Sequence, residues 1–307
     1  HSYPFHFSYS VASLLQMNNP PLLHPYPRPF TTRQGEVTTD EVFGNQKGGQ
    51  FIISNFSMKT KPLDRGGYGV VYRAQWKKSH IAVAVKKLVK DECEGIEESV
   101  VNEINIHNSL RHANIIQMYT ALWTKAHVYI VMEFAKCGNL SGALKALNGR
   151  GFDEKTAGKY TYQIADALHY CHSNHVIHRD LKPENILIAS NGTLKLADFG
   201  CCADSRERNN DWVGTIIYLP PEVLRGEEYG KEFDCWSLGV VIYELITGRN
   251  PFIREGDLDR SVDAQDQRAG WNILNLIYRV PSYVSRGARA LIKSLLKGDP
   301  KDRLAME

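Results

Sequence analysis

Glycines, a lysine and a glutamate in the first third of the chain have the types and the order that phosphate binding would need. The stretch LDRGGYGVVY holds glycines between two β-prone segments, at Gly66, Gly67 and Gly69. Glycine lets backbone N–H groups approach an anion without a Cβ in the way, although glycine turns are often only turns. Lys86 ends the β-prone run AVAVK, and Glu103 lies in a predicted helix beyond it. An ammonium held by a carboxylate under the glycine loop would explain a lysine inside a strand.

Four histidines recur at every third position in LHYCHSNHVIHRDLKPEN, residues 168–185. They are His169, His172, His175 and His178. On a helix each step of three residues turns the direction by about 300°, so these side chains drift by about 60° per step. A zinc-binding pair favours positions i and i+4, and no two of these histidines have that spacing. We therefore expect no metal site here, with the first three histidines at the end of a helix and His178 in a loop.

The elements that must position these residues divide the chain into two parts. β-Prone runs cover residues 70–74, 81–85 and 128–132, and the apolar spacing of a helix face covers residues 96–110. Farther along, the periodicity is mostly helical, over residues 140–147, 154–173, 231–247, 271–278 and 286–296. Strands followed by helices predict an α+β architecture in two parts.

Length and composition indicate the class of protein. A chain of 307 residues can bury a sizeable core in one large domain or two lobes. The net charge of +3 comes without a long Lys/Arg block, which argues against nucleic-acid binding. The six cysteines show no repeated C-x-x-C spacing, which argues against disulfides and structural zinc. The longest apolar run, residues 238–246, is far below the ~20 residues of a membrane span. We expect a soluble, intracellular protein, cytoplasmic or alternatively nuclear.

Residues 1–50 differ from the rest of the chain. Stretches such as HSYPFHFSYS and NNPPLLHPYPRPF are dense in proline and aromatic residues and have no period. Clustered prolines remove backbone donors and fix φ, which disfavours continuous helix or a central strand. We expect a disordered leader, with a Pro-rich docking segment as the alternative.

The motifs, taken in order, resemble the signature of protein kinases. The glycine loop, strand lysine and helix glutamate are followed by HRDLKPEN (residues 178–185), DFG (198–200) and LPPE (219–222). The resemblance covers roughly residues 57–307 and is to a eukaryotic Ser/Thr kinase domain. It implies a kinase domain over residues 51–307 with a bilobal α+β fold. A small β-rich N-lobe with one regulatory helix would take about residues 51–135, and a larger helical C-lobe about residues 136–307. A truncated C-terminus is expected, because the resemblance stops before the family's last helices.

The resemblance implies an enzyme that transfers the γ-phosphoryl group of Mg-ATP to Ser/Thr hydroxyls of protein substrates. Its implied cofactors are ATP and Mg²⁺, which Mn²⁺ could replace, and its implied partners are protein substrates and an upstream kinase or other activator. Neither nucleic acid nor a membrane span is expected. Lys182 in HRDLKPEN, together with Thr215, is similar to the Ser/Thr form of the catalytic loop rather than the tyrosine form.

The resemblance also implies a role for each catalytic residue. Asp180 would accept the proton of the substrate hydroxyl, and Lys182 would neutralise charge that develops on the transferred group. The implied catalytic residues are Asp180, Lys182, Asn185, Lys86 and Glu103, and the implied metal ligands are Asn185 and Asp198.

Nucleotide-binding and structural residues are carried over in the same way. Met132 would be the gatekeeper beside the hinge, and Glu222 would pair with Arg303. Asp234 would accept backbone hydrogen bonds from the catalytic loop, and His178 would pack against Phe199. The implied ATP-binding residues are Leu63, Gly66, Gly67, Gly69, Val71, Ala84, Lys86, Met132, Glu133, Ala135 and Leu187. The implied structural and regulatory residues are His178, Arg179, Phe199, Gly200, Asp211, Thr215, Glu222, Asp234 and Arg303.

Two positions depart from the family pattern. Asp64 replaces the first loop glycine, and we expect it to weaken ATP binding without abolishing it. Pro220 stands where the A-P-E motif has alanine, which we expect to be benign. Asp64 and the truncated C-terminus favour an alternative, a catalytically weak pseudokinase acting as a scaffold. A dinucleotide-dependent enzyme comes third, because a strand rather than a helix follows the glycines.

The activation segment, from DFG to PPE, contains few hydroxyl groups. Before Thr215 its only one belongs to Ser205, and relatives often carry a phosphorylated threonine near the position of Asp211. We hypothesise that Asp211 partly replaces that phosphate by pairing with Arg179, with a solvated loop aspartate as the alternative. Two cysteines that follow DFG, Cys201 and Cys202, are expected to be inert thiols. Subfamily cues are mixed: VYRAQW resembles tyrosine-kinase-like serine kinases and GTIIYLPPE resembles Aurora-like ones.

Overall fold

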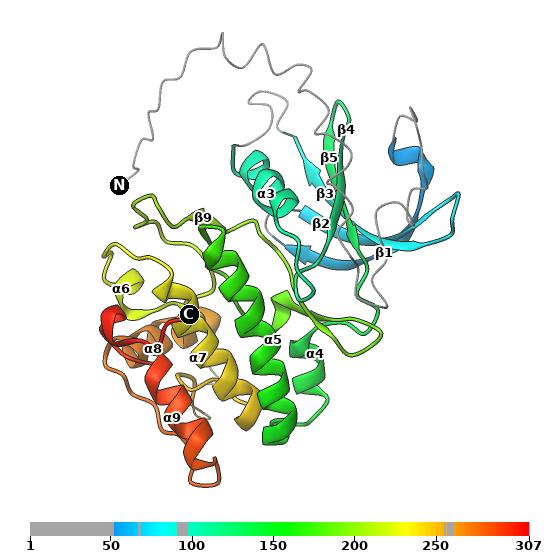
Figure 1. Ribbon diagram of the computed structural model, residues 1–307. Coiled ribbons are helices and arrows are strands. Elements are labelled where there is room, and N and C mark those ends of the chain that lie inside the picture. The colour runs from blue at the N-terminus through cyan, green and yellow to red at the C-terminus, as the bar shows by residue number, and fades with distance from the viewer. Residues whose placement is uncertain (1–51, 67–68, 91–97, 255, 257–260, 307) are drawn as a thin grey trace.

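The computed structural model describes residues 52–66, 69–90, 98–254, 256 and 261–306. Within these ranges the chain forms two lobes, an antiparallel sheet with a helix beside it and a larger body of helices (Figure 1). The predicted α+β class and two-part organisation are confirmed. The predicted leader, residues 1–50, and Gly67 lie outside the described residues.

The N-lobe is a sheet of five antiparallel strands in the order β1-β2-β3-β5-β4. Its strands are β1 (Phe56–Gly66), β2 (Gly69–Trp76), β3 (Ala82–Val89), β4 (Met118–Trp123) and β5 (His127–Glu133). A 3₁₀ turn (Ile53–Asn55) precedes β1, and helix α3 (Glu98–Ser109) packs against β4. The three predicted β-prone runs are confirmed as β2, β3 and β5, which are neighbours in the sheet.

Alternation along β3 decides which side chains face the helix. Val83 and Val85 belong to an apolar cluster on one face of the sheet. Leu88 packs on the other face with Ile104 of α3. Because successive residues of a strand point to opposite faces, Lys86 shares the face of Leu88. The lysine is therefore directed toward α3.

The C-lobe is built around helix α7 (Glu232–Thr247), of which every residue from Phe233 onward is buried. Its sequence, EFDCWSLGVVIYELIT, is apolar on nearly all sides, as a buried helix requires. Helices α5 (Glu154–Ser173) and α9 (Arg286–Leu295) pack against it (Figure 1). Other helices of the described part are α4 (Leu140–Lys145), α6 (Pro221–Leu224) and α8 (Val262–Leu274). Short strands pair as β6 (Val176–Ile177) with β9 (Ala203–Asp204) and β7 (Ile186–Ile188) with β8 (Leu194–Leu196), and 3₁₀ turns cover Pro183–Asn185, Ile216–Tyr218 and Pro300–Asp302.

Local sequence signals set several helix ends. The carboxylate of Asp153 accepts a hydrogen bond from the backbone N–H of Thr156 at 3.0 Å and so caps α5. Helix α7 ends at Gly248, whose φ of 74° is a left-handed conformation that glycine adopts without a Cβ clash. Apart from the segment 271–278, the predicted helices are confirmed, with ends that agree to within two residues.

The helix predicted over residues 271–278 is wrong. Helix α8 runs from Val262 to Leu274, and Ser261 caps it by accepting a hydrogen bond from Ala264 N at 3.4 Å. The chain leaves the helix after Leu274, and Leu276 has a φ of 52°, which an α-helix cannot continue. The first half of α8, VDAQDQRA, has little apolar periodicity, so the pattern favoured the apolar residues that follow the helix.

A buried ion pair joins α6 to the C-terminal segment of the C-lobe. Arg303 Nη1 and Nη2 each lie 2.6 Å from a carboxylate oxygen of Glu222, and the two side chains are 0% and 1% exposed. Arg303 also donates to the carbonyl oxygens of Lys297 and Glu232. The contact expected from the resemblance is therefore present. Pro220 precedes α6 with a φ of −76°, which proline adopts without strain.

Replacing Arg303 by Met should lower the free energy of unfolding by about 3–5 kcal/mol, because it strands the buried Glu222 carboxylate. Urea denaturation monitored by circular dichroism measures the change. The matched control is Arg208→Met, which breaks a surface pair whose Arg208 and Glu228 side chains are 87% and 61% exposed, and it should leave the midpoint unchanged. Equal midpoints for the two variants would contradict this account.

Candidate active site

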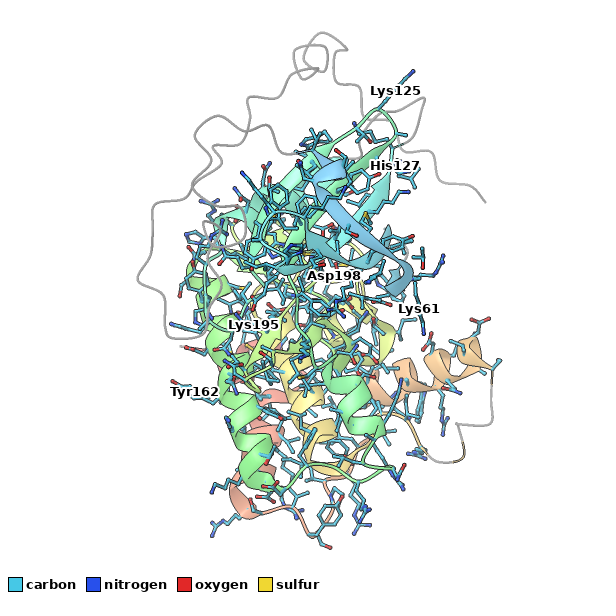
Figure 2. The ribbon with its side chains drawn as sticks, turned by 90° about the vertical axis from the view of Figure 1, so that its right-hand side faces the viewer. Lys61, Lys125, His127, Tyr162, Lys195 and Asp198 are labelled. Carbon is cyan, nitrogen blue, oxygen red and sulfur yellow. The ribbon has the colours of Figure 1, made fainter. Side chains whose placement is uncertain are left out.

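The residues that the sequence singled out gather where the sheet meets the helical lobe. Figure 2 shows Asp198 at this level, between the strands and the helices. Strand β3 and helix α3 contribute from the N-lobe. The C-lobe contributes the loop that follows β6 and the segment that follows β8.

Lys86 connects the two lobes through two carboxylates. Its Nζ lies 2.6 Å from Oε1 of Glu103 on α3 and 3.1 Å from Oδ1 of Asp198 in the C-lobe. Burial alone would lower the pKa of Lys86, but Asp198 and Glu103 outweigh burial and raise it above its usual value. The side chain of Asp198 is 46% exposed. A charged ammonium is thus held beside an opening that an anion can reach.

Three polar side chains of the loop after β6, Asp180, Lys182 and Asn185, form a closed network with Thr215 of the activation segment. Oδ2 of Asp180 accepts hydrogen bonds from Lys182 Nζ and Asn185 Nδ2, both at 2.8 Å. Oδ1 of Asp180 accepts from Thr215 Oγ1 at 3.0 Å, and Lys182 Nζ donates to the same hydroxyl at 2.8 Å. Asp180 is therefore fixed in orientation, with a lysine beside it.

The carboxylate of Asp234 on α7 forms hydrogen bonds with the backbone of this loop. Asp234 is 0% exposed and accepts hydrogen bonds from the backbone N–H groups of His178 at 2.8 Å and Arg179 at 2.9 Å. His172 Nε2 lies 2.8 Å from Oδ2 of the same carboxylate. Sequence reasoning expected the backbone bonds but missed His172. Its place beside Leu168 on the buried face of α5 is the signal that could have found it.

Phe199 is enclosed by one histidine from each lobe. The ring of His178 lies edge-on to it at 5.3 Å, as expected, and the ring of His107 on α3 stacks on it at 4.6 Å. Burial lowers the pKa of His107 to about 4, so this ring is neutral at pH 7. His107 was not predicted. A Cβ at Gly200 would lie 3.3 Å from Oε2 of Glu103, so the glycine permits a close approach of α3.

Three residues predicted to contact the nucleotide share the face of Lys86. Val71 lies directly opposite Lys86 across β2 and β3, and Ala84 lies opposite Met132 across β3 and β5. Residues opposite each other in a sheet point to the same side. The predicted nucleotide residues outside this group lie on β1 (Leu63 and Gly66), at the start of β2 (Gly69), at and after the end of β5 (Glu133 and Ala135) and on β7 (Leu187).

The glycine loop contains one glycine that packing requires. Gly69 has a φ of 152°, and a Cβ there would lie 2.6 Å from the carbonyl oxygen of Lys87. Asp64 is exposed, and its Oδ1 accepts a hydrogen bond from the backbone N–H of Arg65 at 2.8 Å. The weaker ATP binding expected from Asp64 stays a prediction.

A further ion pair, between Lys195 and Glu133, joins the two lobes. Lys195 Nζ on β8 lies 3.0 Å from Oε2 of Glu133, and the backbone N–H of Gln117 donates to the same oxygen at 3.2 Å. The Lys195 side chain is buried. Lys195 was not predicted, although a lysine within the apolar run LKL is the same signal that singled out Lys86.

The remaining motifs of the sequence can also be placed. His169 and His175 are exposed, whereas His172 and His178 are buried, so these histidines do not share a face. Within the described ranges, no three His, Cys, Asp or Glu side chains gather as metal ligands would. Burial raises the pKa of the Cys201 thiol to about 11, which makes it a weak nucleophile at neutral pH. No described helix is long and apolar enough to span a membrane.

Comparison with known proteins identifies the family. The pattern described as "Protein kinase domain" matches residues 58–307. An "Aurora/IPL1-related protein kinase 2" of Caenorhabditis elegans is 42% identical over 266 residues, which is 85% of this chain and 83% of the relative. An "Aurora kinase B" of Mus musculus is 38% identical over 86% of this chain and 74% of the relative. An "Aurora kinase" of Patiria pectinifera is 37% identical over 90% of this chain and 67% of the relative.

These relatives favour the predicted enzyme over the alternative of a pseudokinase, and none of them points to a dinucleotide-dependent enzyme. The family uses ATP with a divalent metal and acts on proteins. The chain belongs to the protein kinase family and is a serine/threonine protein kinase.

Proposed function

We propose that the chain transfers the γ-phosphoryl group of Mg-ATP to Ser/Thr hydroxyls, with Asp180 as the residue that orients the substrate hydroxyl and accepts its proton. The closed network of Asp180 with Lys182, Asn185 and Thr215 carries this proposal. In that network Lys182 lies where it can neutralise charge that develops on the transferred group. Thr215 fixes the position of the Asp180 carboxylate relative to the Lys182 ammonium group by forming hydrogen bonds with both.

The donor set of the site fits Mg²⁺. Asn185 gives its amide N–H groups to Asp180, which leaves its amide oxygen for a metal, and Asp198 presents a half-exposed carboxylate. Mg²⁺ prefers oxygen ligands and binds through one or two carboxylates together with phosphates and water. When bound, the metal would neutralise phosphate charge. Lys86, held by Glu103, would bind the α/β-phosphates beside it.

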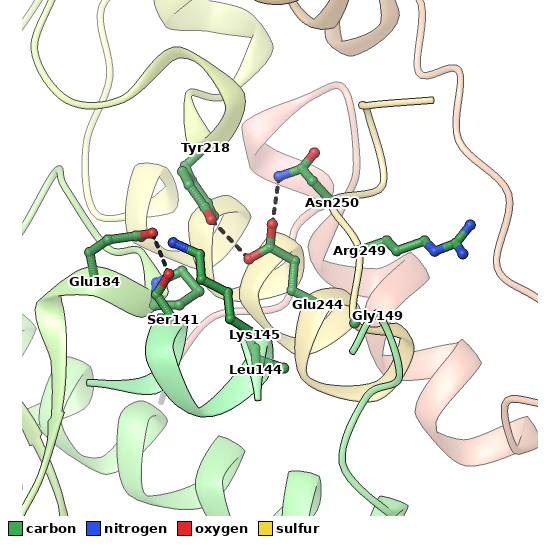
Figure 3. A pocket seen from close by; sticks show the side chains of 11 residues that line it. Ser141, Leu144, Lys145, Gly149, Glu184, Tyr218, Glu244, Arg249 and Asn250 are labelled. Carbon is green, nitrogen blue, oxygen red and sulfur yellow. Dashed lines mark hydrogen bonds between the residues drawn. The ribbon is translucent and has the colours of Figure 1, made fainter. Parts of the chain in front are cut away.

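A pocket next to the catalytic loop supports a basic residue as part of the substrate. It is lined by Glu184, two residues from Lys182, and by Glu244 of α7 (Figure 3). Ser141 donates to Glu184 at 2.7 Å, and Tyr218 donates to Glu244 at 2.8 Å. Two carboxylates in a pocket attract a cationic side chain.

Cations also line this pocket. Glu244 is buried, and its two carboxylate oxygens accept hydrogen bonds from Tyr218 and Asn250, so it contributes negative charge to the pocket wall rather than a free oxygen. Arg249 points away from Glu244 (Figure 3). Lys145 of α4 lies on the side of Glu184 and Tyr218, which reduces the net negative charge of the pocket. We therefore propose that substrates carry an arginine or lysine near the phosphorylated residue.

Within the family we propose an Aurora-like kinase. The support is the identity of 37–42% with relatives that bear this name, together with the Aurora-like segment GTIIYLPPE. Cytoplasmic or nuclear location and the need for an upstream activator stay predictions.

Replacing Asp180 by Asn should lower the rate of phosphate transfer by about 10²–10⁴-fold, because the proton acceptor is lost while the shape is kept. Transfer from radiolabelled ATP with Mg²⁺ to a generic Ser/Thr protein substrate measures this. Asp263→Asn, at an exposed position at the start of α8, is the matched control and should retain full activity. Absence of transfer by the unaltered chain would refute the proposed function.

The preference for a basic residue should increase with pH. Burial raises the pKa of Glu244 to about 7, although bonds from Tyr218 and Asn250 oppose the shift. A bound cation favours the ionised carboxylate, so selectivity grows as Glu244 loses its proton. The ratio of kcat/KM for peptides with Arg and with norleucine should rise by up to about tenfold from pH 6 to 8.

Glu244→Gln should remove this pH dependence, whereas the surface control Glu227→Gln should keep it. A peptide library first identifies the position at which a basic residue is preferred. The peptides with Arg and with norleucine are then compared at that position. A ratio that stays flat with pH in the unaltered chain would count against the role of Glu244 in binding a cation.

A further inference from the structure

Asp211, in the middle of the activation segment, is held by two donors. Arg179 Nη1 lies 2.7 Å from Oδ1 of Asp211, and the hydroxyl of Tyr229 donates to the same oxygen at 2.6 Å. Arg179 Nη1 also donates to the Tyr229 hydroxyl at 2.7 Å, so the three side chains close a triangle. Burial alone would raise the pKa of Asp211, but Tyr229 and Arg179 outweigh it and lower the pKa below its usual value. The carboxylate is therefore ionised at neutral pH.

Arg179 ties this carboxylate to the catalytic loop and to the start of the segment. Its Nε donates to the carbonyl oxygen of Cys201, and Nη2 donates to that of Cys202 at 3.4 Å. Its backbone N–H donates to Asp234 at 2.9 Å. The residue that follows Arg179 is Asp180. Arg179, which precedes the catalytic Asp180, therefore contacts the activation segment both at its start, through Cys201 and Cys202, and in its middle, through Asp211.

Two further hydrogen bonds involve residues of the activation segment close to Asp211. The backbone N–H of Tyr229 donates to the carbonyl oxygen of Asn209 at 2.9 Å. Trp212 Nε1 donates to the carbonyl oxygen of Val223 at 2.7 Å, so the residue after Asp211 is tied to α6. These bonds attach Asn209 and Trp212, on either side of Asp211 in the chain, to other parts of the C-lobe.

The positive charge paired with Asp211 is that of one arginine, which balances a single negative charge. Among the described residues, Arg179 is the only cation that forms an ion pair with Asp211. The two other arginines of the segment pair elsewhere, Arg206 with Asp204 and Arg208 with Glu228. Helix α3, ESVVNEINIHNS, contains neither lysine nor arginine. A phosphoryl group carries about −1.5 to −2 charges, whereas the ion pair formed at this position supplies one positive charge. One arginine and one hydroxyl suit a carboxylate.

We propose that Asp211 is a positioning residue that fixes the activation segment through Arg179 and Tyr229, so that transfer does not require a phosphate on this segment. Asp211 contacts no reacting group and acts through Arg179 on the loop that carries Asp180. The inference rests on the proposed function, because it concerns how the transferring site is held.

The experiment uses the full chain, dephosphorylated with a phosphatase and checked by intact mass. The rate of transfer and the KM for ATP are measured for the unaltered chain and for four variants. Asp211→Asn removes the charge and keeps the shape, Asp211→Glu restores the charge, and Tyr229→Phe removes one donor. Glu207→Gln, an exposed acid of the same segment, is the matched control for loss of charge. Thermal unfolding and hydrogen exchange of residues 201–215 accompany the kinetics.

The dephosphorylated chain should keep its rate, and Asp211→Asn should lower kcat by about tenfold while the KM for ATP stays within about twofold. Exchange over residues 201–215 should become faster in Asp211→Asn, and Asp211→Glu should recover most of both properties. Tyr229→Phe should have a smaller effect and Glu207→Gln none. Unchanged unfolding temperatures exclude a general loss of fold.

Two results would overturn the inference. One is loss of activity of the unaltered chain on dephosphorylation, and the other is an Asp211→Asn variant as fast as the unaltered chain. Neither result affects the proposed function, which fails only if the unaltered chain transfers no phosphate in any form. If Asp211→Asn unfolds at a lower temperature, its kinetics are set aside. The inference is then tested by comparing the transfer rates of the dephosphorylated and the untreated unaltered chain.

Discussion

The geometry of the catalytic loop depends on the buried carboxylate of Asp234. An ionised carboxylate without solvent is costly unless its oxygens are bonded, and two backbone N–H groups and the imidazole of His172 supply the bonds. In return the carboxylate holds Arg179 at a φ of 65°, a left-handed conformation that costs a residue other than glycine about 1–3 kcal/mol. Asp180 follows this turn directly, so the turn sets the direction of its side chain. The core helix α7 thereby helps to fix the orientation of Asp180 in the catalytic loop.

Contacts between the two lobes include two ion pairs and a stack of two rings. Lys86 reaches Asp198, Lys195 reaches Glu133, and His107 stacks on Phe199. Apolar contacts also cross the boundary, because the large cluster of the C-lobe includes Leu110 and Ile115 of the N-lobe, and Ile106 of α3 packs against it. The site is complete only when the N-lobe brings Lys86 to the C-lobe carboxylate.

Much of the fold could be predicted because the signals were local. The β-prone runs and the long amphipathic pattern of α5 depend on neighbouring residues, and the structure has them where periodicity predicted them. Helix α8 was misplaced because its start depends on the Ser261 cap and its first turns are polar. Site contacts carried by motifs, such as Lys86 with Glu103, were expected from the resemblance. His107 was missed because its ring partner Phe199 lies far away in the chain. His172 and Lys195 carry a local signal, a polar residue within an apolar face or run, but that signal does not reveal the distant partner, Asp234 or Glu133.

The enclosure of Phe199 has a consequence for compounds that compete with ATP. Its ring is 1% exposed and contacts a histidine of each lobe, so swinging it out would break both ring contacts and open a cavity. The swung-out conformation is therefore sparsely populated. A compound that requires it loses apparent affinity in proportion to that population. Compounds that compete with ATP are better built on the face shared by Ala84, Met132 and Lys86, which is already formed.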